Sequence, residues 1–189
     1  MKKKDCYDLN AIDSKTKFIL AHLFVEKRTK KRCIEFLSQI KTTCYNQILT
    51  RYYTEKYNKR KKKRLIKFVC DGFENYKSSF NKLFYRVAEL QFGVPIACKK
   101  YNFEFNNNAI ERYNGKIKDR IKSIRSGFKN FKNAECFMNL RRIIYNYVNP
   151  HQELKGKTPA EIAGVNLKLG RNKLMNLIKY VKDNYAPLS

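Results

Sequence analysis

The sequence has 189 residues, which is enough for one main domain with a buried core. Lys and Arg total 42 against 16 Asp and Glu, so the formal net charge is +26, and a charge of this size attracts polyanions, nucleic acid first among them. Thirteen Tyr and thirteen Phe argue against a disordered basic tail, and the longest apolar stretch, residues 18–25, is too short to span a bilayer, so we expect a folded cytoplasmic protein without a membrane partner.

The first elements that the sequence predicts are a hairpin and a long helix. Residues 6–12 and 17–25 are rich in strand formers, and the turn-like triplet 13–15 separates them, so they predict two antiparallel strands. From residue 29 to about residue 53, apolar residues recur at steps of three and four, which is the spacing of an amphipathic helix.

The middle of the chain alternates between strands, helices and basic connections. Six consecutive basic residues, 59–64, are interpreted as a nucleic-acid patch or as a solvated loop, and we favour the loop. Residues 65–70 predict a buried strand that ends at the turn Asp71-Gly72, and a helix is expected at about 76–85. Gly93 and Pro95 limit the stretch 87–105 to a short strand and an irregular connection.

The last part of the chain predicts helices. Three asparagines, Asn106 to Asn108, supply cap residues for a helix that runs to about residue 123, and a second long helix spans about 130–148. Residues 158–161 form a capping box with Pro at the first helical position, and a short final helix is expected at about 171–185. The apolar side of the helix at 130–148 is expected to consist of Phe131, Phe137, Leu140, Ile143, Ile144 and Tyr147.

The predicted order of elements is typical of an α/β protein, a mixed sheet flanked by helices. Active sites of such sheets form at the carboxyl ends of strands, and Asp71 directly follows a predicted strand. Acids are scarce in this chain, so a carboxylate at this position, next to a glycine that allows close approach, is a candidate metal ligand. Stabilising the turn or capping the next helix is an equally good interpretation of Asp71.

Glu111 lies near the start of the helix that follows the asparagines. The helical spacing places it beside Gly115, Lys118 and Lys122, so a carboxylate could hold Mg²⁺ above a basic track for a nucleic-acid strand. The alternative is that Glu111 only complements the helix N-terminus. Its helix is expected to bury Ile110, Ile117, Ile121 and Ile124. The candidate DNA-binding residues are Arg112, Lys116, Lys118, Lys122, Arg125 and Lys129.

Three strings resemble segments of one protein family. The first, NNNAIERYNGKIKDRIKSIRSGFKNFKNAE at Asn106–Glu135, resembles the segment around the catalytic glutamate of transposases from bacterial and archaeal insertion sequences. The second, FVCDGFENY at Phe68–Tyr76, is similar to their second aspartate motif, and YNYVNPHQELKGKTPAEIAG at Tyr145–Gly164 is similar to the tail of their catalytic domain. Asp71 and Glu111 are 40 positions apart (111 minus 71), which is close to the spacing typical of the family.

The resemblance implies a DDE-type transposase or integrase catalytic core with a ribonuclease H-like fold. In this family two aspartates and a glutamate hold two divalent cations, Mg²⁺ or Mn²⁺, for cleavage of DNA and strand transfer at the ends of an insertion sequence. The resemblance gives Asp71 the role of the second aspartate and Glu111 that of the glutamate. It covers about residues 6–165, which we interpret as a partial core, followed by a helical appendage at residues 166–189.

The sequence departs from the family pattern at its beginning. The family carries its first aspartate on a strand that precedes the hairpin, whereas Asp13 matches a turn position and Asp5 and Asp8 fall on the next strand, so none of the three is assigned a catalytic role. We therefore expect an N-terminally truncated core whose first, central strand is missing, which exposes strand edges and leaves the chain inactive alone. The competing interpretations are a non-catalytic basic nucleic-acid-binding protein and a ribonucleoprotein scaffold that prefers RNA, and a homo-oligomer stays open.

Overall fold

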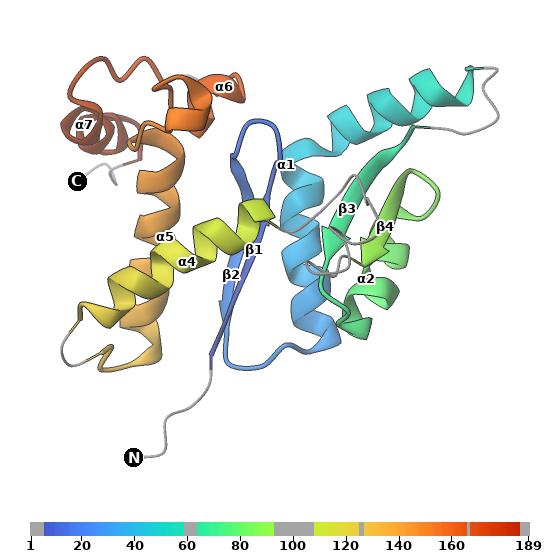
Figure 1. The fold of residues 1–189 in the computed structure, drawn as a ribbon, viewed down its shortest axis with the longest axis horizontal. Coiled ribbons are helices and arrows are strands. Elements are labelled where there is room, and N and C mark those ends of the chain that lie inside the picture. Colours follow the sequence, from blue (N-terminus) through green and yellow to red (C-terminus); the bar gives the residue numbers. More distant parts are fainter. Residues whose placement is uncertain (1–5, 59–63, 93–107, 125–126, 166, 186–189) are drawn as a thin grey trace. The chain divides into compact units, whose positions relative to one another are not determined.

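The computed structural model divides into two compact units (Figure 1). The first unit contains Met1–Ile12 and Leu20–Ser123, and the second contains Asp13–Ile19 and Ile124–Ser189. The predicted boundary between residues 165 and 166 is not tested by this division and stays a prediction. The structure describes residues 6–58, 64–92, 108–124, 127–165 and 167–185.

The strands that the structure describes form two small sheets. Strand β1 (Tyr7–Ile12) pairs with β2 (Ile19–Val25), and β3 (Ile66–Cys70) pairs in parallel with β4 (Ala88–Phe92). The four predicted strands are thus confirmed, and the fold is mixed α/β. Among the described residues, β1 and β3 each have one hydrogen-bonded neighbour and do not pair with each other, so the expected ribonuclease H-like sheet with its central strand missing stays a prediction.

Strand β3 is less buried than its apolar sequence predicts. All five of its residues are half-buried. Ile66 and Phe68 pack against the hydrophobic core, whereas side chains alternate along a strand, so Lys67 and Val69 point to the opposite face. Pairing along one edge only leaves the strand partly exposed, which is the physical reason why the prediction of a buried strand was wrong.

The described residues of the first unit form three helices: α1 (Lys30–Lys56), α2 (Glu74–Phe84) and α4 (Asn108–Lys122). Helix α1 begins at Thr29, whose hydroxyl accepts a hydrogen bond from the Arg32 N–H at 3.3 Å. It continues three residues beyond its predicted end and is kinked at Cys44, where φ is −138° and ψ is 18°. The predicted helices are confirmed in type and place.

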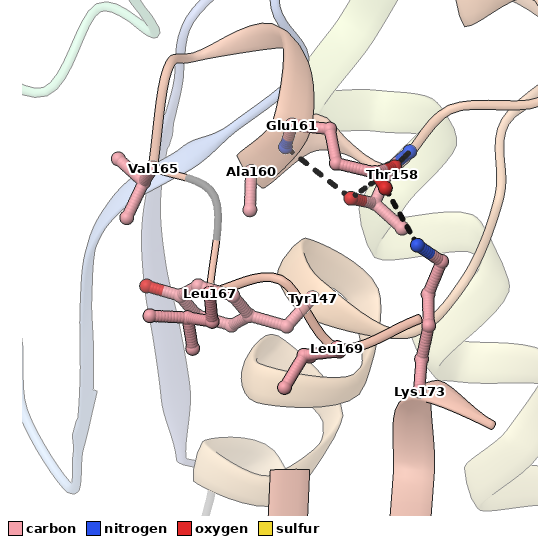
Figure 2. A pocket seen from close by; sticks show the side chains of 8 residues that line it. All are labelled: Tyr147, Thr158, Ala160, Glu161, Val165, Leu167, Leu169 and Lys173. Atoms are coloured by element: carbon pink, nitrogen blue, oxygen red, sulfur yellow. Dashed lines mark hydrogen bonds and ion pairs between the residues drawn. The ribbon is translucent and has the colours of Figure 1, made fainter. Parts of the chain in front are cut away.

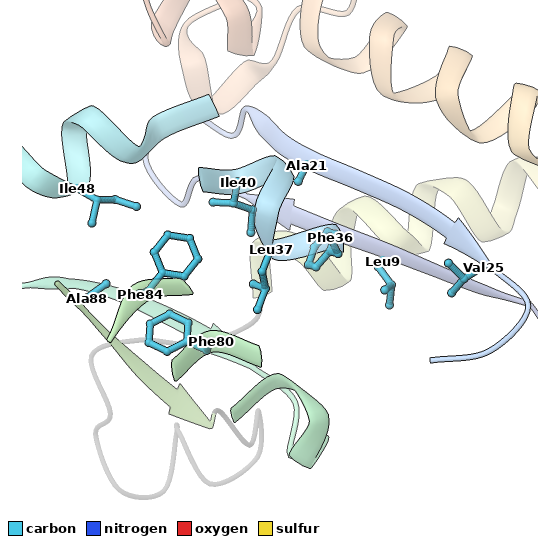
Figure 3. Packing of buried hydrophobic residues seen from close by; sticks show 10 residues of the cluster. All are labelled: Leu9, Ala21, Val25, Phe36, Leu37, Ile40, Ile48, Phe80, Phe84 and Ala88. Atoms are coloured by element: carbon cyan, nitrogen blue, oxygen red, sulfur yellow. The ribbon is translucent and has the colours of Figure 1, made fainter. Parts of the chain in front are cut away.

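A hydrophobic cluster joins both sheets to α1 and α2 (Figure 3). Phe68 of β3 lies 5.2 Å from Phe80 and 5.0 Å from Phe84, measured between ring centroids, and the two α2 rings are 5.3 Å apart. Phe84 is fully buried. The buried members of this cluster are Leu9, Ala21, Val25, Phe36, Leu37, Ile40, Ile48, Phe80, Phe84 and Ala88.

A polar clamp fixes the start of β3 to the end of α1. The buried carboxylate of Glu55 accepts a hydrogen bond from the Arg64 N–H at 3.0 Å, and Arg51 Nε donates to the Arg64 carbonyl at 2.8 Å. Arg51 also pairs with Glu55 at 3.1 Å. Both ends of the basic connection are therefore held, while residues 59–63, which carry the predicted solvated loop, lie outside the described residues.

The second unit contains α5 (Phe131–Tyr147), the 3₁₀ turn η1 (Gln152–Leu154), α6 (Pro159–Ile162) and α7 (Lys173–Tyr185). The predicted capping box is confirmed: Thr158 and Glu161 exchange hydrogen bonds at the start of α6. The predicted apolar side of α5 was wrong at Leu140, which is about half exposed, while its other five residues are half-buried. The prediction was based on the bulkiest apolar side chains of the helix. The residues that α5 buries are instead Ala134, Met138, Tyr145 and Asn146.

Within the described ranges, no helix is both long and apolar enough to cross a membrane.

Candidate functional site

Asp71 directly follows β3, at the carboxyl end of the parallel pair β3–β4. Its side chain is about half exposed, and Oδ2 lies 3.0 Å from Nη1 of Arg28. Oδ1 accepts a weak hydrogen bond from the Phe73 N–H at 3.4 Å. The carboxylate thus makes a contact that stabilises the turn, which was one of the two interpretations of Asp71 from the sequence. It also forms an ion pair with a residue 43 positions away.

Burial raises the pKa values of titratable side chains near Asp71. Burial raises the pKa of the Cys70 thiol to about 12, and the negative charge of Asp71 adds to this rise. Burial also raises the pKa values of Cys33 and Tyr76, on which the Asp71 carboxylate and the Arg28 guanidinium act in opposite directions. These shifts favour the neutral forms of Cys33, Cys70 and Tyr76.

A chain of polar contacts links α4 to the first sheet. His22 of β2 lies 2.6 Å from Asp8 of β1, measured from Nε2 to Oδ1, and the other Asp8 oxygen accepts a hydrogen bond from Asn10 Nδ2 at 2.7 Å. The same Asn10 nitrogen lies 3.5 Å from Oδ1 of Asn114 on α4. Asp8 thus belongs to a network that reaches α4, and its lack of a catalytic role stays a prediction.

Helix α4 presents Glu111 on an exposed face. Tyr113 and Ile117 are its fully buried residues, while Ile110 and Ile121 are half-buried, so the helix packs through a stripe that includes a tyrosine the sequence analysis left out. At 100° per residue, the positions beside Glu111 on the exposed face are Gly115, Lys118 and Lys122. Glu111 has no hydrogen bond or ion pair with any residue that the structure describes.

The predicted DNA-binding residues fall into three groups. Arg112, Lys116 and Lys118 are exposed on α4, and Lys122 is exposed there as well, 3.7 Å from Asp119. Lys129 is exposed in the second unit, and Arg125 lies outside the described residues. In the part of the chain that the structure describes, no group of three or more His, Cys, Asp or Glu side chains could hold a metal ion. Asp71 and Glu111 therefore stay candidate metal ligands.

Sequence reasoning missed Arg28 altogether. It stands among several basic residues between β2 and α1, and nothing in the local sequence distinguishes it from Lys27 or Lys30. Only the fold brings Arg28 to the end of β3, where Asp71 lies.

The second unit has a small pocket of a different kind (Figure 2). Its volume is about 10 Å³, which is at the lower limit for one water molecule. Two of its polar lining groups, Glu161 and Lys173, are bonded to each other at 2.6 Å, and Thr158 completes the capping box. The pocket is a packing feature of α5, α6 and α7 and has no room for a substrate.

Comparison with known proteins supports one class. Residues 105–159 match a family model described as an integrase core domain, which supports a catalytic-core-like domain of the integrase and transposase class, whose members recombine DNA. The matched segment includes Glu111 and all of α4, whereas Asp71 lies outside it. No curated protein and no solved structure matches the chain.

Proposed function

We propose that this chain is the greater part of a DDE-type transposase core that cleaves and joins DNA at the ends of an insertion sequence. The observation that carries the proposal is Glu111, which lies within the segment that matches the integrase core, on the exposed face of α4 beside Lys118 and Lys122. An acid on an otherwise cationic face is suited to hold a divalent ion next to a bound phosphodiester. The net charge of +26 favours the same polyanionic partner.

The donor chemistry of the two acids fits Mg²⁺ or Mn²⁺. Carboxylate oxygens are the hard ligands that these ions prefer. The Asp71 carboxylate already forms an ion pair with a cation, the guanidinium of Arg28. Two carboxylates are fewer than the three that the resembled family uses. Within the described ranges, no third acid joins them in a metal-binding group, so the proposal requires a third ligand from elsewhere.

We propose that the third acid stands on a further strand that pairs with β1 and β3. Both strands have one hydrogen-bonded neighbour among the described residues, and both contribute to the same hydrophobic cluster. A strand between them would join the two sheets into one and satisfy their open edges. Without that strand the metal site is incomplete, and we expect no catalysis from Asp71 and Glu111 alone.

In this proposal the side chains have separate tasks. Asp71 and Glu111 hold the ions, and bound divalent ions supply activation of an attacking water or 3′-hydroxyl and stabilisation of the leaving oxygen. Lys118 and Lys122 position the DNA backbone without reading its sequence, since cationic side chains mainly contact phosphates. The chain itself provides no protein nucleophile for the reaction.

Binding of Mn²⁺, followed by electron paramagnetic resonance of the free ion, tests the metal site. We expect Asp71→Asn and Glu111→Gln each to weaken Mn²⁺ binding by about tenfold or more, because each removes a charged ligand. Asp119→Asn is the matched control, since Asp119 is an exposed acid on the same helix as Glu111, and its effect should stay below about twofold. Equal effects of all three substitutions would contradict the site.

Strand-transfer assays with Mg²⁺ or Mn²⁺ on a range of DNA ends test the proposed inactivity. We expect no product from this chain. Robust activity that Asp71→Asn abolishes would show that two carboxylates suffice and would overturn the need for a further strand.

The second candidate function is non-catalytic binding of nucleic acid, which the basic face of α4 favours by itself. It predicts DNA affinity that divalent ions do not raise and that Glu111→Gln slightly increases, since a negative charge is removed. The transposase proposal predicts instead that Mn²⁺ strengthens DNA binding and that Glu111→Gln removes this gain. A clear preference for RNA at matched salt would favour the scaffold interpretation.

A further inference from the structure

Arg28 is held at the end of β3 from several sides. Its guanidinium carbon lies 5.0 Å from the ring centroid of Tyr7 and 4.4 Å from that of Phe73, and Nη1 lies 3.0 Å from Asp71. The backbone carbonyl of Arg28 accepts a hydrogen bond from Asn75 at 3.4 Å. Segments from β1, the β3–α2 turn and the start of α2 thus converge on one arginine.

These contacts make the ion pair more ordered than an ordinary surface pair. The Arg28 side chain is 30% exposed, which is less than either partner of the exposed Arg32–Glu35 pair. Two aromatic rings restrict the guanidinium, so little side-chain freedom is lost when it meets Asp71. Asp71 itself is 56% exposed, so solvent screens the pair and a competing cation can reach the free side of the carboxylate.

The two acids of the proposed metal site are therefore in different states. Glu111 has no ionic partner among the described residues, while Asp71 already has a monovalent one. A guanidinium and a divalent ion on the same carboxylate repel each other, because both are positive and lie within a few ångströms. A divalent ion must either tolerate this repulsion or displace the guanidinium.

We propose that Arg28 is a built-in counter-ion of Asp71, which neutralises the carboxylate in the metal-free chain and is displaced when a divalent cation binds. The inference rests on the proposed metal role of Asp71. Arg28 is then a positioning residue: it keeps Asp71 compensated and oriented at the end of β3, and it lowers the affinity for the first ion. When a metal ion displaces the Arg28 guanidinium from Asp71, the contacts of that guanidinium with the Tyr7 and Phe73 rings change as well.

The first test measures Mn²⁺ affinity at low ionic strength for the whole chain and its Arg28 variants. Arg28→Gln keeps a planar side chain between the rings but removes the charge, and we expect it to bind Mn²⁺ about three to ten times more tightly than the wild type. Arg28→Lys keeps the charge and should stay close to the wild type. Arg32→Gln, which removes the guanidinium of a neighbouring exposed pair, is the matched control and should change the affinity by less than about twofold.

A double substitution separates failure of this inference from failure of the proposed function. In the Asp71→Asn background, Arg28→Gln should give no gain in Mn²⁺ affinity. If Asp71→Asn weakens binding but Arg28→Gln leaves it unchanged, the counter-ion role is overturned and the metal role of Asp71 stands. If Asp71→Asn has no effect, the metal role of Asp71 fails and the inference fails with it.

The second test uses the wild-type chain, so it does not depend on how a variant folds. Mg²⁺ is titrated while the Nε–H resonances of the arginine side chains are followed by nuclear magnetic resonance. We expect the Arg28 signal to shift with the midpoint of metal binding, while the signal of Arg32 stays in place. An Arg28 signal that does not move at saturating Mg²⁺ overturns the proposed displacement.

Discussion

The contacts inside the first unit differ in kind from those inside the second. The first unit relies on a hydrophobic cluster in which Phe68, Phe80 and Phe84 pack ring against ring between two small sheets. The second unit buries apolar residues as well, among them Met138 and Leu177, and adds buried polar groups, since Asn146 is 3% exposed and Thr158 is 1% exposed. Aromatic packing distinguishes the first unit, and directed hydrogen bonds add to apolar burial in the second.

The difference bears on where a functional site can form. A hydrophobic cluster has no directional requirement, so the first unit can keep its core while the edges of β1 and β3 and the carboxylates of Asp71 and Glu111 stay available. In the second unit the polar groups already have partners, as the partly exposed pair of Glu161 and Lys173 illustrates. Three substitutions sharpen this comparison.

The largest effect is expected at Phe84, which is fully buried and contacts Phe68, Phe80 and Tyr45. Phe84→Ala should lower the free energy of unfolding of the first unit by about 3–5 kcal/mol, because it leaves a cavity in the cluster. This free energy is measured by urea unfolding, in which backbone amide signals of each unit are followed by nuclear magnetic resonance. Phe92→Ala is the control, since Phe92 is a 42% exposed phenylalanine of the same unit, and a cost as large as that of Phe84→Ala would contradict the role of the cluster.

The next largest effect is expected at Asn146 of α5. Its Oδ1 accepts from the Ile19 N–H at 2.9 Å, and its Nδ2 donates to the Ile19 carbonyl at 3.1 Å. Asn146→Ala leaves both buried backbone groups without this partner and should cost the second unit about 2–3 kcal/mol in the same urea experiment. Asn133→Ala, at an exposed site of the same helix, should change stability by less than about 0.5 kcal/mol. Similar values for the two variants would show that the buried bonds add nothing.

Local patterns in the sequence predicted the elements of both units. The capping box at Thr158 and Glu161 was predicted from four adjacent residues, because the two side chains satisfy each other's backbone groups within one turn. The helical spacing after residue 29 placed α1, and Thr29 indeed caps it. Asp71 was placed correctly at the end of a strand, and Glu111 was placed correctly in the first turn of a helix, although it is exposed and not at the edge of the buried stripe.

Contacts between distant residues could not be predicted in this way. Asn146 and its partner Ile19 are 127 positions apart, and the apolar pattern of α5 pointed to Leu140, which is exposed, instead of to the buried asparagine. Arg28 reaches Asp71 across 43 positions, and in a chain with 42 basic residues no local signal singles it out. The separation into two sheets also depends on long-range pairing, which the strand patterns alone leave open.

The smallest effect is expected from the pH dependence of the second unit. Glu161 accepts hydrogen bonds from Lys173 Nζ and from the Thr158 N–H, and mainly the bond from Lys173 lowers its pKa from 4.5 to about 2. A carboxyl group whose pKa is lowered by folding stabilises the folded state above its unfolded pKa. Its contribution is therefore fully present above about pH 4.5 and is lost as the pH falls towards 2.

The full shift overstates the energy, because both side chains are partly exposed and water screens the pair. We expect the second unit to lose about 1–2 kcal/mol between pH 5 and pH 2.5 through this group, measured as the difference between the wild type and Glu161→Gln in urea unfolding. Glu153→Gln is the control, since Glu153 is 57% exposed and its pair with Lys17 is longer, at 3.5 Å. If the wild type and Glu161→Gln respond to acid in parallel, the bond from Lys173 does not stabilise the unit, and its buried polar contacts reduce to those of Asn146 and the Thr158 cap.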